Sequence, residues 1–120
     1  MAPSVATAAG RPVLALGTPG SYGICQTQVQ ALVHRVDFKL GLQDAIEAPR
    51  ARLWDGRRVQ TETRIAAATL DALRQRGHEV EATEPWTRQA GSMQSIAIDP
   101  DSGVMTGAAD PRRVGYVATP

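Results

Sequence analysis

Hydrophobic and polar positions recur with changing periods along the 120-residue chain, and these periods predict its elements. Residues 11–17 form a short apolar run bounded by Pro and Gly, which predicts a buried strand. Further along, apolar side chains fall at helical spacing, with glutamines and an arginine between them: Val29, Leu32, Val33, Val36 and Leu40. We therefore predict a helix from Cys25 to Lys39, ended by Gly41.

The rest of the chain alternates short helices with short strands. Residues 42–48 suit a short helix before Pro49. Residues 65–77 predict the clearest helix, because they are good helix formers with two arginines in the last turn and a glycine stop. Three stretches suit strands or hairpins: a hairpin turning at Asp55–Gly56, an edge strand over residues 78–83, and a hairpin over residues 92–110 turning at Asp99–Gly103. The tail after residue 110 is expected to be irregular.

This order of elements indicates an α+β fold in a single domain, residues 1–120, with an antiparallel component.

The composition argues against binding to nucleic acids or membranes. The 13 basic and 12 acidic side chains give a net charge of +1, so the chain has no general attraction to nucleic acid or anionic membranes. Residues 1–10 lack a basic leader and a long apolar stretch, and no apolar run is long enough to span a membrane. We expect a soluble chain with no signal peptide or membrane segment.

Three glycines follow the first predicted strand, at Gly17, Gly20 and Gly23. Their G-x-x-G-x-x-G spacing is not the dinucleotide-binding G-x-G-x-x-G, and no Gly-Lys-Ser/Thr follows, so a nucleotide phosphate is not indicated. Two interpretations remain. The turn could present free backbone N–H groups to a negative oxygen, or it could be a plain tight turn.

The cysteine and histidines do not form a site in the sequence. Cys25 is the only cysteine, which rules out an internal disulfide. Cys25 and His34 are nine residues apart and face opposite sides of one helix. We predict a buried thiol at Cys25 and a surface position for His34. His78 has no partner at ligand spacing, so no metal site is predicted.

A second weak motif lies at residues 99–110, where Asp99, Asp101 and Asp110 occupy positions 1, 3 and 12 of a calcium loop. Position 6 needs a glycine but holds Val104, and position 12 is not the usual Glu. A β-turn closed by Asp, Ser and Gly explains this segment better.

No complete catalytic set is visible. The chain has no G-x-S-x-G elbow. An N-terminal Thr, Ser or Cys activates itself through its own α-amine, but this chain begins Met1-Ala2.

The ordered segments GRPVLALGTPG, QALVHRVDFKLGLQDAIEAPR, LDALRQRGHEV and GSMQSIAIDPDSGVMTGAADPRR, with a final GY, resemble the γ-glutamyltranspeptidase family. The resemblance is to the C-terminal part of the small subunit and runs from residue 1 to about residue 116. It implies a partial αββα sandwich of the N-terminal-nucleophile hydrolases, made of two subunits cut from one precursor by self-cleavage. It implies no cofactor.

The resemblance also implies an activity. In the family, the new N-terminal Thr of the small subunit attacks a γ-glutamyl amide, as in glutathione, and the acyl-enzyme passes to water or to an amino acid. Some relatives act on other acyl amides, such as oxamate or cephalosporin side chains. By resemblance, the backbone N–H groups of Gly20 and Ser21 form the oxyanion hole. Ser21 departs from the family, where a second glycine is usual, and Tyr22 adds further bulk, so glutathione is a doubtful substrate.

The nucleophilic Thr and the residues that bind the substrate's amino and carboxyl groups lie upstream of the matching region in the family. Met1-Ala2-Pro3 resembles a Met-x-Pro that follows them. We therefore expect an internal start or a broken copy, and the rest of the precursor as partner: the large subunit and the first half of the small subunit.

The chain alone is predicted to be inactive. The alternatives are a non-catalytic remnant or binding module, and an autonomous amidase, which lacks a nucleophile. Isolated, the chain should aggregate, oligomerise or stay partly unfolded, because sheet edges and faces normally covered by the partner are exposed.

Overall fold

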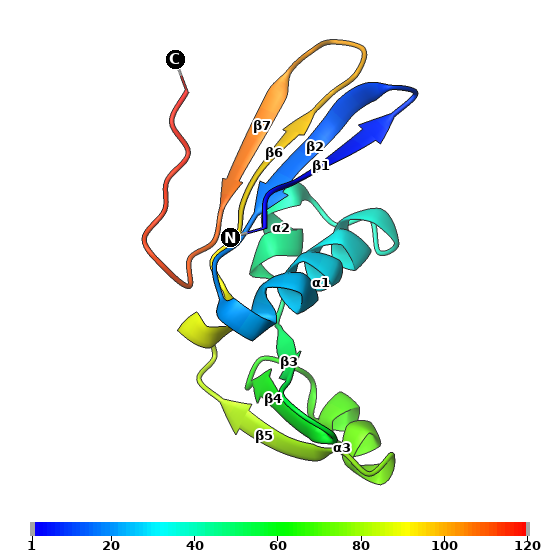
Figure 1. The fold of residues 1–120 in the computed structure, drawn as a ribbon, viewed down its shortest axis with the longest axis vertical. Coiled ribbons are helices and arrows are strands. Elements are labelled where there is room, and N and C mark those ends of the chain that lie inside the picture. The colour runs from blue at the N-terminus through cyan, green and yellow to red at the C-terminus, as the bar shows by residue number, and fades with distance from the viewer. Residues whose placement is uncertain (1, 120) are drawn as a thin grey trace.

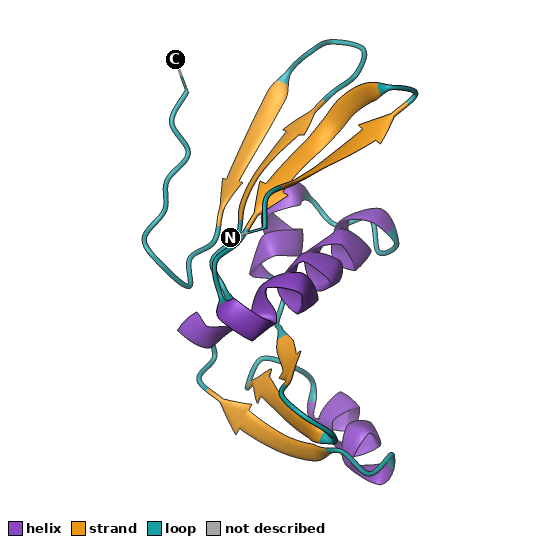
Figure 2. Cartoon of the chain, in the orientation of Figure 1, coloured by secondary structure: helices purple, strands orange, loops and turns teal. Residues whose placement is uncertain are grey.

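The computed structural model describes residues 2–119 and contains two sheets, each accompanied by helices (Figures 1 and 2). Met1, on which the Met-x-Pro interpretation depends, lies outside the described residues. Within residues 2–119, none of the helices combines the length and the apolar character needed to cross a bilayer.

The larger sheet has four antiparallel strands in the order β1-β2-β6-β7. Its strands are β1 (Ser4–Ala8), β2 (Arg11–Gly17), β6 (Gln94–Ile98) and β7 (Met105–Ala109). The predicted strand at 11–17 is thus confirmed as β2, and the hairpin over residues 92–110 as β6 and β7. Strand β1, which the sequence pattern does not predict, reaches β2 through a tight turn at Ala9 and Gly10, both with positive φ.

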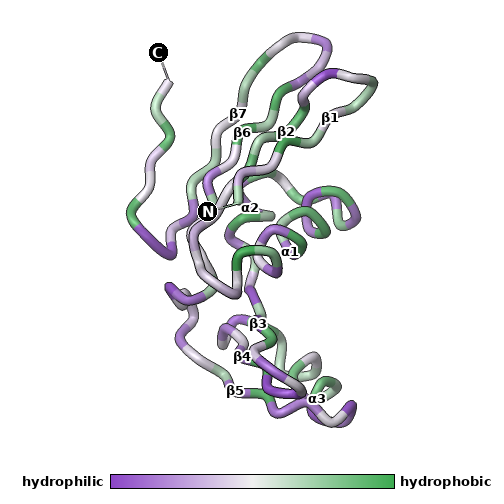
Figure 3. Tube along the Cα trace, viewed as in Figure 1, coloured by the Kyte–Doolittle hydropathy of each residue, from purple (hydrophilic) through white to green (hydrophobic). Residues whose placement is uncertain are grey.

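Two helices, α1 (Ile24–Val36) and α2 (Leu42–Glu47), cover one face of this sheet. The core between them is small: Leu14, Leu16, Ala31, Ile46, Met93 and Ala108. The side chain of Gln43 fixes α2 to the edge strand, since its amide donates to the Ala109 carbonyl at 2.9 Å and accepts from the Ala109 N–H at 3.2 Å. Figure 3 shows hydrophobic positions along these helices and the large sheet, whereas β4 and β5 are mainly hydrophilic.

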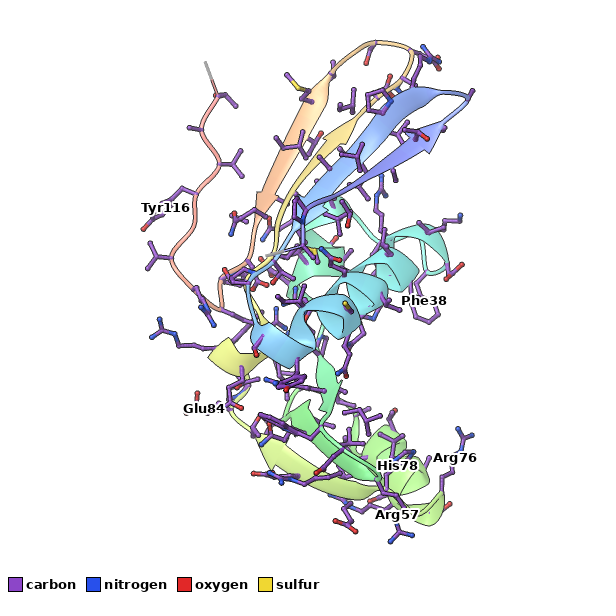
Figure 4. The ribbon with its side chains drawn as sticks, viewed as in Figure 1. Phe38, Arg57, Arg76, His78, Glu84 and Tyr116 are labelled. Carbon is purple, nitrogen blue, oxygen red and sulfur yellow. The ribbon has the colours of Figure 1, made fainter. Side chains whose placement is uncertain are left out.

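The opposite face of the large sheet carries no helix. A groove of about 500 Å³ lies there, between the sheet and the irregular tail after residue 112. Val117 of the tail packs so closely on Gly107 that a β-carbon at position 107 would lie 2.5 Å from its methyl group. Ile96 of β6 lines the groove and is 45% exposed, and Tyr116 projects from the tail (Figure 4). The open face is therefore apolar and only partly covered.

The smaller sheet has the order β3-β4-β5: β3 (Ala51–Leu53), β4 (Arg58–Glu62) and β5 (Glu79–Thr83). Its first two strands form the predicted hairpin, with Gly56 at φ +49°. Helix α3 (Ala67–Gln75) connects β4 to the parallel strand β5, which lies at the sheet edge as predicted. A short 3-10 turn, η2 (Arg88–Ala90), leads back to the large sheet.

Helix α1 corrects two details of the sequence analysis. It ends at Val36, three residues before the predicted end, where the Phe38 N–H turns back to the Val33 carbonyl. Part of its apolar stripe faces outward, because Val29 and Val36 are more than half exposed, whereas Leu32 packs against the core. Toward the small sheet, α1 uses amides for its contacts: the Gln26 and Gln30 side chains each donate to and accept from the backbone of β3, at 2.8–2.9 Å.

Candidate active site

The glycine turn lies between the end of β2 and the 3-10 turn η1 (Ser21–Gly23), which runs directly into α1. Gly20 has φ +144° and Ser21 has φ +52°, so two successive residues have positive φ. Among residues 2–119, neither the Gly20 N–H nor the Ser21 N–H donates a backbone hydrogen bond. Both stand at the positive end of a helical segment, where N–H groups and the helix dipole favour a negative oxygen. The turn therefore has the properties of an anion-stabilising site.

Ser21 occupies a backbone conformation that glycine adopts without strain. For an L-residue with a side chain, the left-handed region costs about 1–2 kcal/mol. Tyr22 follows it and is 80% exposed, with its ring on the surface of the turn. Both Ser21 and Tyr22 are therefore exposed on the surface of the turn.

The segment between η2 and β6 supports the turn through hydrogen bonds and close packing. The Thr18 side chain is completely buried, and its Oγ1 accepts a hydrogen bond from the Ser92 N–H at 2.9 Å and donates to the Pro19 carbonyl at 2.7 Å. Gly91 has φ +89°, and a β-carbon there would lie 2.6 Å from Thr18 Oγ1. Thr27 of α1 donates to the Ala90 carbonyl at 2.9 Å. No motif in the sequence marks these contacts.

A buried ion network lies behind this segment, and it joins the ends of the EAPR and GAADPR segments. Arg50 Nη1 lies 2.6 Å from Asp110 Oδ2, and Arg112 Nη1 lies 3.1 Å from Asp110 Oδ1. Arg112 also donates from Nε and Nη2 to the two oxygens of Glu62, at 2.6 and 2.7 Å. Two arginines and two carboxylates balance in charge, which is what full burial requires.

The same network ties both sheets to the turn. Arg50 donates to the carbonyls of Ile46 and Ala90, at 2.7 and 2.9 Å, and Asp110 accepts the Met93 N–H at 2.9 Å. Glu62 is the last residue of β4 in the small sheet, whereas Asp110 follows β7 in the large one. The sequence analysis quotes the longer segments that contain EAPR and GAADPR but does not predict that these residues meet.

The electrostatics of the two arginines differ. Burial lowers the pKa of Arg50, although the Asp110 carboxylate acts in the opposite direction. Burial also disfavours the charged form of Arg112, but its hydrogen bonds to Glu62 and the charge of Asp110 outweigh this and raise its pKa. An arginine stays protonated in either case.

At the rim of the ion network, Arg64 lies 2.9 Å from Glu62 and stacks on Trp86, with its guanidinium carbon 3.4 Å from the ring centroid.

Cys25 and His34 do not cluster at the glycine turn. Cys25 is exposed, so the prediction of a buried thiol is wrong; it lies in the first turn of α1, outside the face that packs on the protein. His34 is half-buried, and its ring lies 5.8 Å from that of Phe38. Burial lowers its pKa. Within residues 2–119, no three His, Cys, Asp or Glu side chains gather to hold a metal ion.

In the weak calcium motif, Asp110 lies apart from Asp99 and Asp101. Asp99 Oδ1 accepts the N–H groups of Asp101 and Ser102, at 3.0 and 2.7 Å, and so closes the β6–β7 turn. Asp110 lies at the far end of β7 in the ion network. The segment is a hairpin with an aspartate-closed turn, as the sequence predicts.

Comparison with known proteins decides the family. The model of the family described as Gamma-glutamyltranspeptidase matches residues 1–119. The chain belongs to the gamma-glutamyltranspeptidase family. It is 43% identical over 110 residues to the Acylase ACY 1 proenzyme of Pseudomonas sp. (strain SE83), covering 91% of this chain and 19% of that protein. It is 34% identical over 115 residues to the Glutathione hydrolase proenzyme of Escherichia coli (strain K12), covering 95% of this chain and 19% of that protein.

Among solved structures, the cephalosporin acylase from Bacillus halodurans superposes with a TM-score of 0.91 at 32% identity, over 97% of this chain and 22% of that one. The predicted family and the mixed α+β fold of an N-terminal-nucleophile hydrolase are thereby confirmed. The chain spans about a fifth of the length of these curated relatives. The role of Gly20 and Ser21 remains a prediction.

Proposed function

We propose that the chain is the C-terminal part of the small subunit of a γ-glutamyltranspeptidase-like amidohydrolase and that it supplies the oxyanion hole. The observation that carries this proposal is the pair of successive positive-φ residues, Gly20 and Ser21, whose N–H groups have no backbone acceptor at the start of a helical segment. An oxyanion hole needs two such donors on a rigid support.

In the proposed reaction, a threonine on another part of the protein attacks the carbonyl carbon of an amide. The carbonyl oxygen becomes negative and is stabilised by the N–H groups of Gly20 and Ser21. Collapse of this intermediate expels the amine, which takes up the proton that the threonine hydroxyl gave to its own α-amine, and leaves an acyl ester on the threonine. Attack by water or by an amino group then releases the acyl product and restores the hydroxyl. Each oxyanion donor is worth roughly 3–4 kcal/mol of barrier.

The acyl group is proposed to differ from that of glutathione. Ser21 adds a side chain where the family usually has glycine, and the Tyr22 ring lies beside it. The higher identity to an acylase, 43%, than to a glutathione hydrolase, 34%, agrees with this. An amide of another acyl group, such as oxamate or a cephalosporin side chain, is the alternative substrate class.

A second candidate is a non-catalytic remnant or binding module that keeps the scaffold. The observation that favours it is the side chain of Ser21, which adds bulk beside the turn's N–H groups at a positive-φ position that glycine adopts without strain. The two candidates differ in whether the turn still stabilises an oxyanion once a nucleophile is supplied.

A chimera separates them. The matching segment of the Escherichia coli glutathione hydrolase is replaced by this chain, and self-cleavage and hydrolysis of a chromogenic γ-glutamyl anilide and of oxamate or cephalosporin-type amides are measured. We expect self-cleavage and turnover of at least one amide, and a loss of about 100-fold in kcat for Gly20→Ala, which displaces one donor. A folded, self-cleaved chimera that hydrolyses none of these amides supports the non-catalytic candidate. The chain alone should turn over no γ-glutamyl anilide, and heat-sensitive turnover by it would overturn the proposal.

A further inference from the structure

We propose that Thr18 is a positioning residue that orients the oxyanion-hole N–H groups by fixing the peptide plane between Pro19 and Gly20. The inference rests on the proposed function of the turn. It concerns a buried residue of the GTPG segment whose hydroxyl is already engaged in two hydrogen bonds.

The argument begins with the planarity of the peptide. The Pro19 carbonyl and the Gly20 N–H belong to one trans peptide unit, so they point in opposite directions. The Thr18 hydroxyl, which is buried, donates to the Pro19 carbonyl at 2.7 Å. Because this bond holds the carbonyl toward the interior, the Gly20 N–H faces away from it.

The next peptide plane is fixed in the same manner from the other side. The Gly20 carbonyl accepts the Gly23 N–H at 3.0 Å within η1. The Ser21 N–H belongs to the same peptide unit as this carbonyl and therefore points away from the helical turn. Of the two planes, only the first depends on a side chain, and that side chain is Thr18.

Thr18 is itself held in place. Its Oγ1 accepts the Ser92 N–H at 2.9 Å, and it packs on Gly91, where a β-carbon would approach to 2.6 Å. Arg50 and Thr27 anchor the preceding carbonyl of Ala90, both at 2.9 Å. The hydroxyl thus connects a buried, hydrogen-bonded segment to the Pro19–Gly20 peptide. Glycine at position 20 makes a flip of this peptide sterically easy, which is why an external restraint matters there.

The test compares three variants of the full chain. Thr18→Val keeps the shape and removes both hydrogen bonds, Thr18→Ser keeps the hydroxyl, and Thr106→Val removes an exposed threonine hydroxyl from β7 as a control. Amide hydrogen exchange is followed by mass spectrometry in a peptide that contains Ser92. We expect about tenfold faster exchange of the Ser92 amide in Thr18→Val, near-unchanged exchange in Thr18→Ser, and no effect in Thr106→Val. If all amides of the isolated chain exchange rapidly, the same measurement is made in the self-cleaved chimera.

Activity supplies a readout that a merely structural role would not move. In the chimera, Thr18→Val should lower kcat by about tenfold or more with KM within about twofold, because the misplaced donor serves the transition state, and Thr18→Ser should restore kcat. Unchanged kcat in a folded Thr18→Val chimera, or unchanged Ser92 exchange, would overturn the inference. An inactive wild-type chimera would instead refute the proposed function, while the exchange measurement would still test the role of Thr18 in the turn.

Discussion

Removal of the Asp110 carboxylate should destabilise the chain more than any surface change. Asp110 is completely buried and accepts four hydrogen bonds. Two come from the Arg50 and Arg112 guanidinium groups and two from the backbone N–H groups of Met93 and Arg112. Asp110→Ala therefore removes one of two buried negative charges and leaves the Met93 N–H without its acceptor.

The magnitude follows from the charge balance of the network. Arg50 and Arg112 face Glu62 and Asp110, so the substitution leaves one uncompensated positive charge in the interior. Breaking a buried pair by removing one partner costs about 3–5 kcal/mol. A domain of this size is stable by about 5–15 kcal/mol in total. Asp110→Ala should thus remove about a fifth or more of the free energy of unfolding. Asp110→Asn, which keeps the shape but leaves the same uncompensated positive charge, should also cost about 3–5 kcal/mol.

Urea unfolding at low protein concentration measures this effect, since urea does not screen charges as guanidinium chloride does. The fluorescence of Trp86 reports on the network directly, because Arg64 and Arg112 lie 3.4 and 5.1 Å from its ring centroid. Asp101→Ala is the matched control. It removes an exposed carboxylate 3.8 Å from Arg11, and such surface pairs contribute about 0–1 kcal/mol. If Asp110→Ala lowered the free energy of unfolding no more than Asp101→Ala, the network would not stabilise the fold.

Three further predictions concern the turn, the histidine and the open sheet face. Ser21→Gly should raise the free energy of unfolding by about 0.5 kcal/mol, because relief of left-handed strain exceeds the entropy cost of glycine, whereas Ser21→Val should lower it in the same urea assay. Burial lowers the pKa of His34 in the folded chain, so its contribution to stability is present above its unfolded pKa and is lost as the pH falls through the folded pKa. The thermal midpoint should therefore fall less between pH 7.5 and pH 5.5 in His34→Gln than in the unsubstituted chain; equal falls would contradict this. Sedimentation should show self-association of the isolated chain that Ile96→Lys on the open face reduces and Leu53→Lys on the small sheet does not. A sharp two-state melt of a monomer would show that the exposed face does not cause self-association.

Local pattern predicts the elements of this chain because each depends on residues near in sequence. The hairpins turn at Gly56 and Gly103, both at positive φ, as their dipeptide and turn chemistry requires. Strand β1 is missed because Ser4–Ala8 is short and rich in small residues, and it becomes a strand only by pairing with β2. The thiol of Cys25 is predicted on the wrong side of α1, since the helix packs through Ala31, Leu32 and its glutamines and leaves Cys25 exposed.

The same distinction between local and long-range contacts applies to the candidate site. The glycine turn is visible in the sequence because strand, turn and helix are contiguous there. Its supports are not visible, since Thr18 meets Ser92 across 74 positions and Arg50 meets Asp110 across 60. The topology of the two sheets brings such distant residues together, so these hydrogen bonds produce no periodic pattern in the sequence.

The supports also explain how a turn with a strained Ser21 can persist. Strained backbone survives only where the surroundings over-determine it. Here the turn is bounded by the Thr18 hydroxyl on one side and by η1 on the other, and both rest on a segment anchored to a charge-balanced buried network. The support for this turn therefore lies outside it, in the hydrogen bonds from Ser92 to Thr18 and from Arg50 to the Ala90 carbonyl. A substitution in the network should then weaken the turn as well as the fold, whereas Ser21→Gly should relax the turn and leave the network intact.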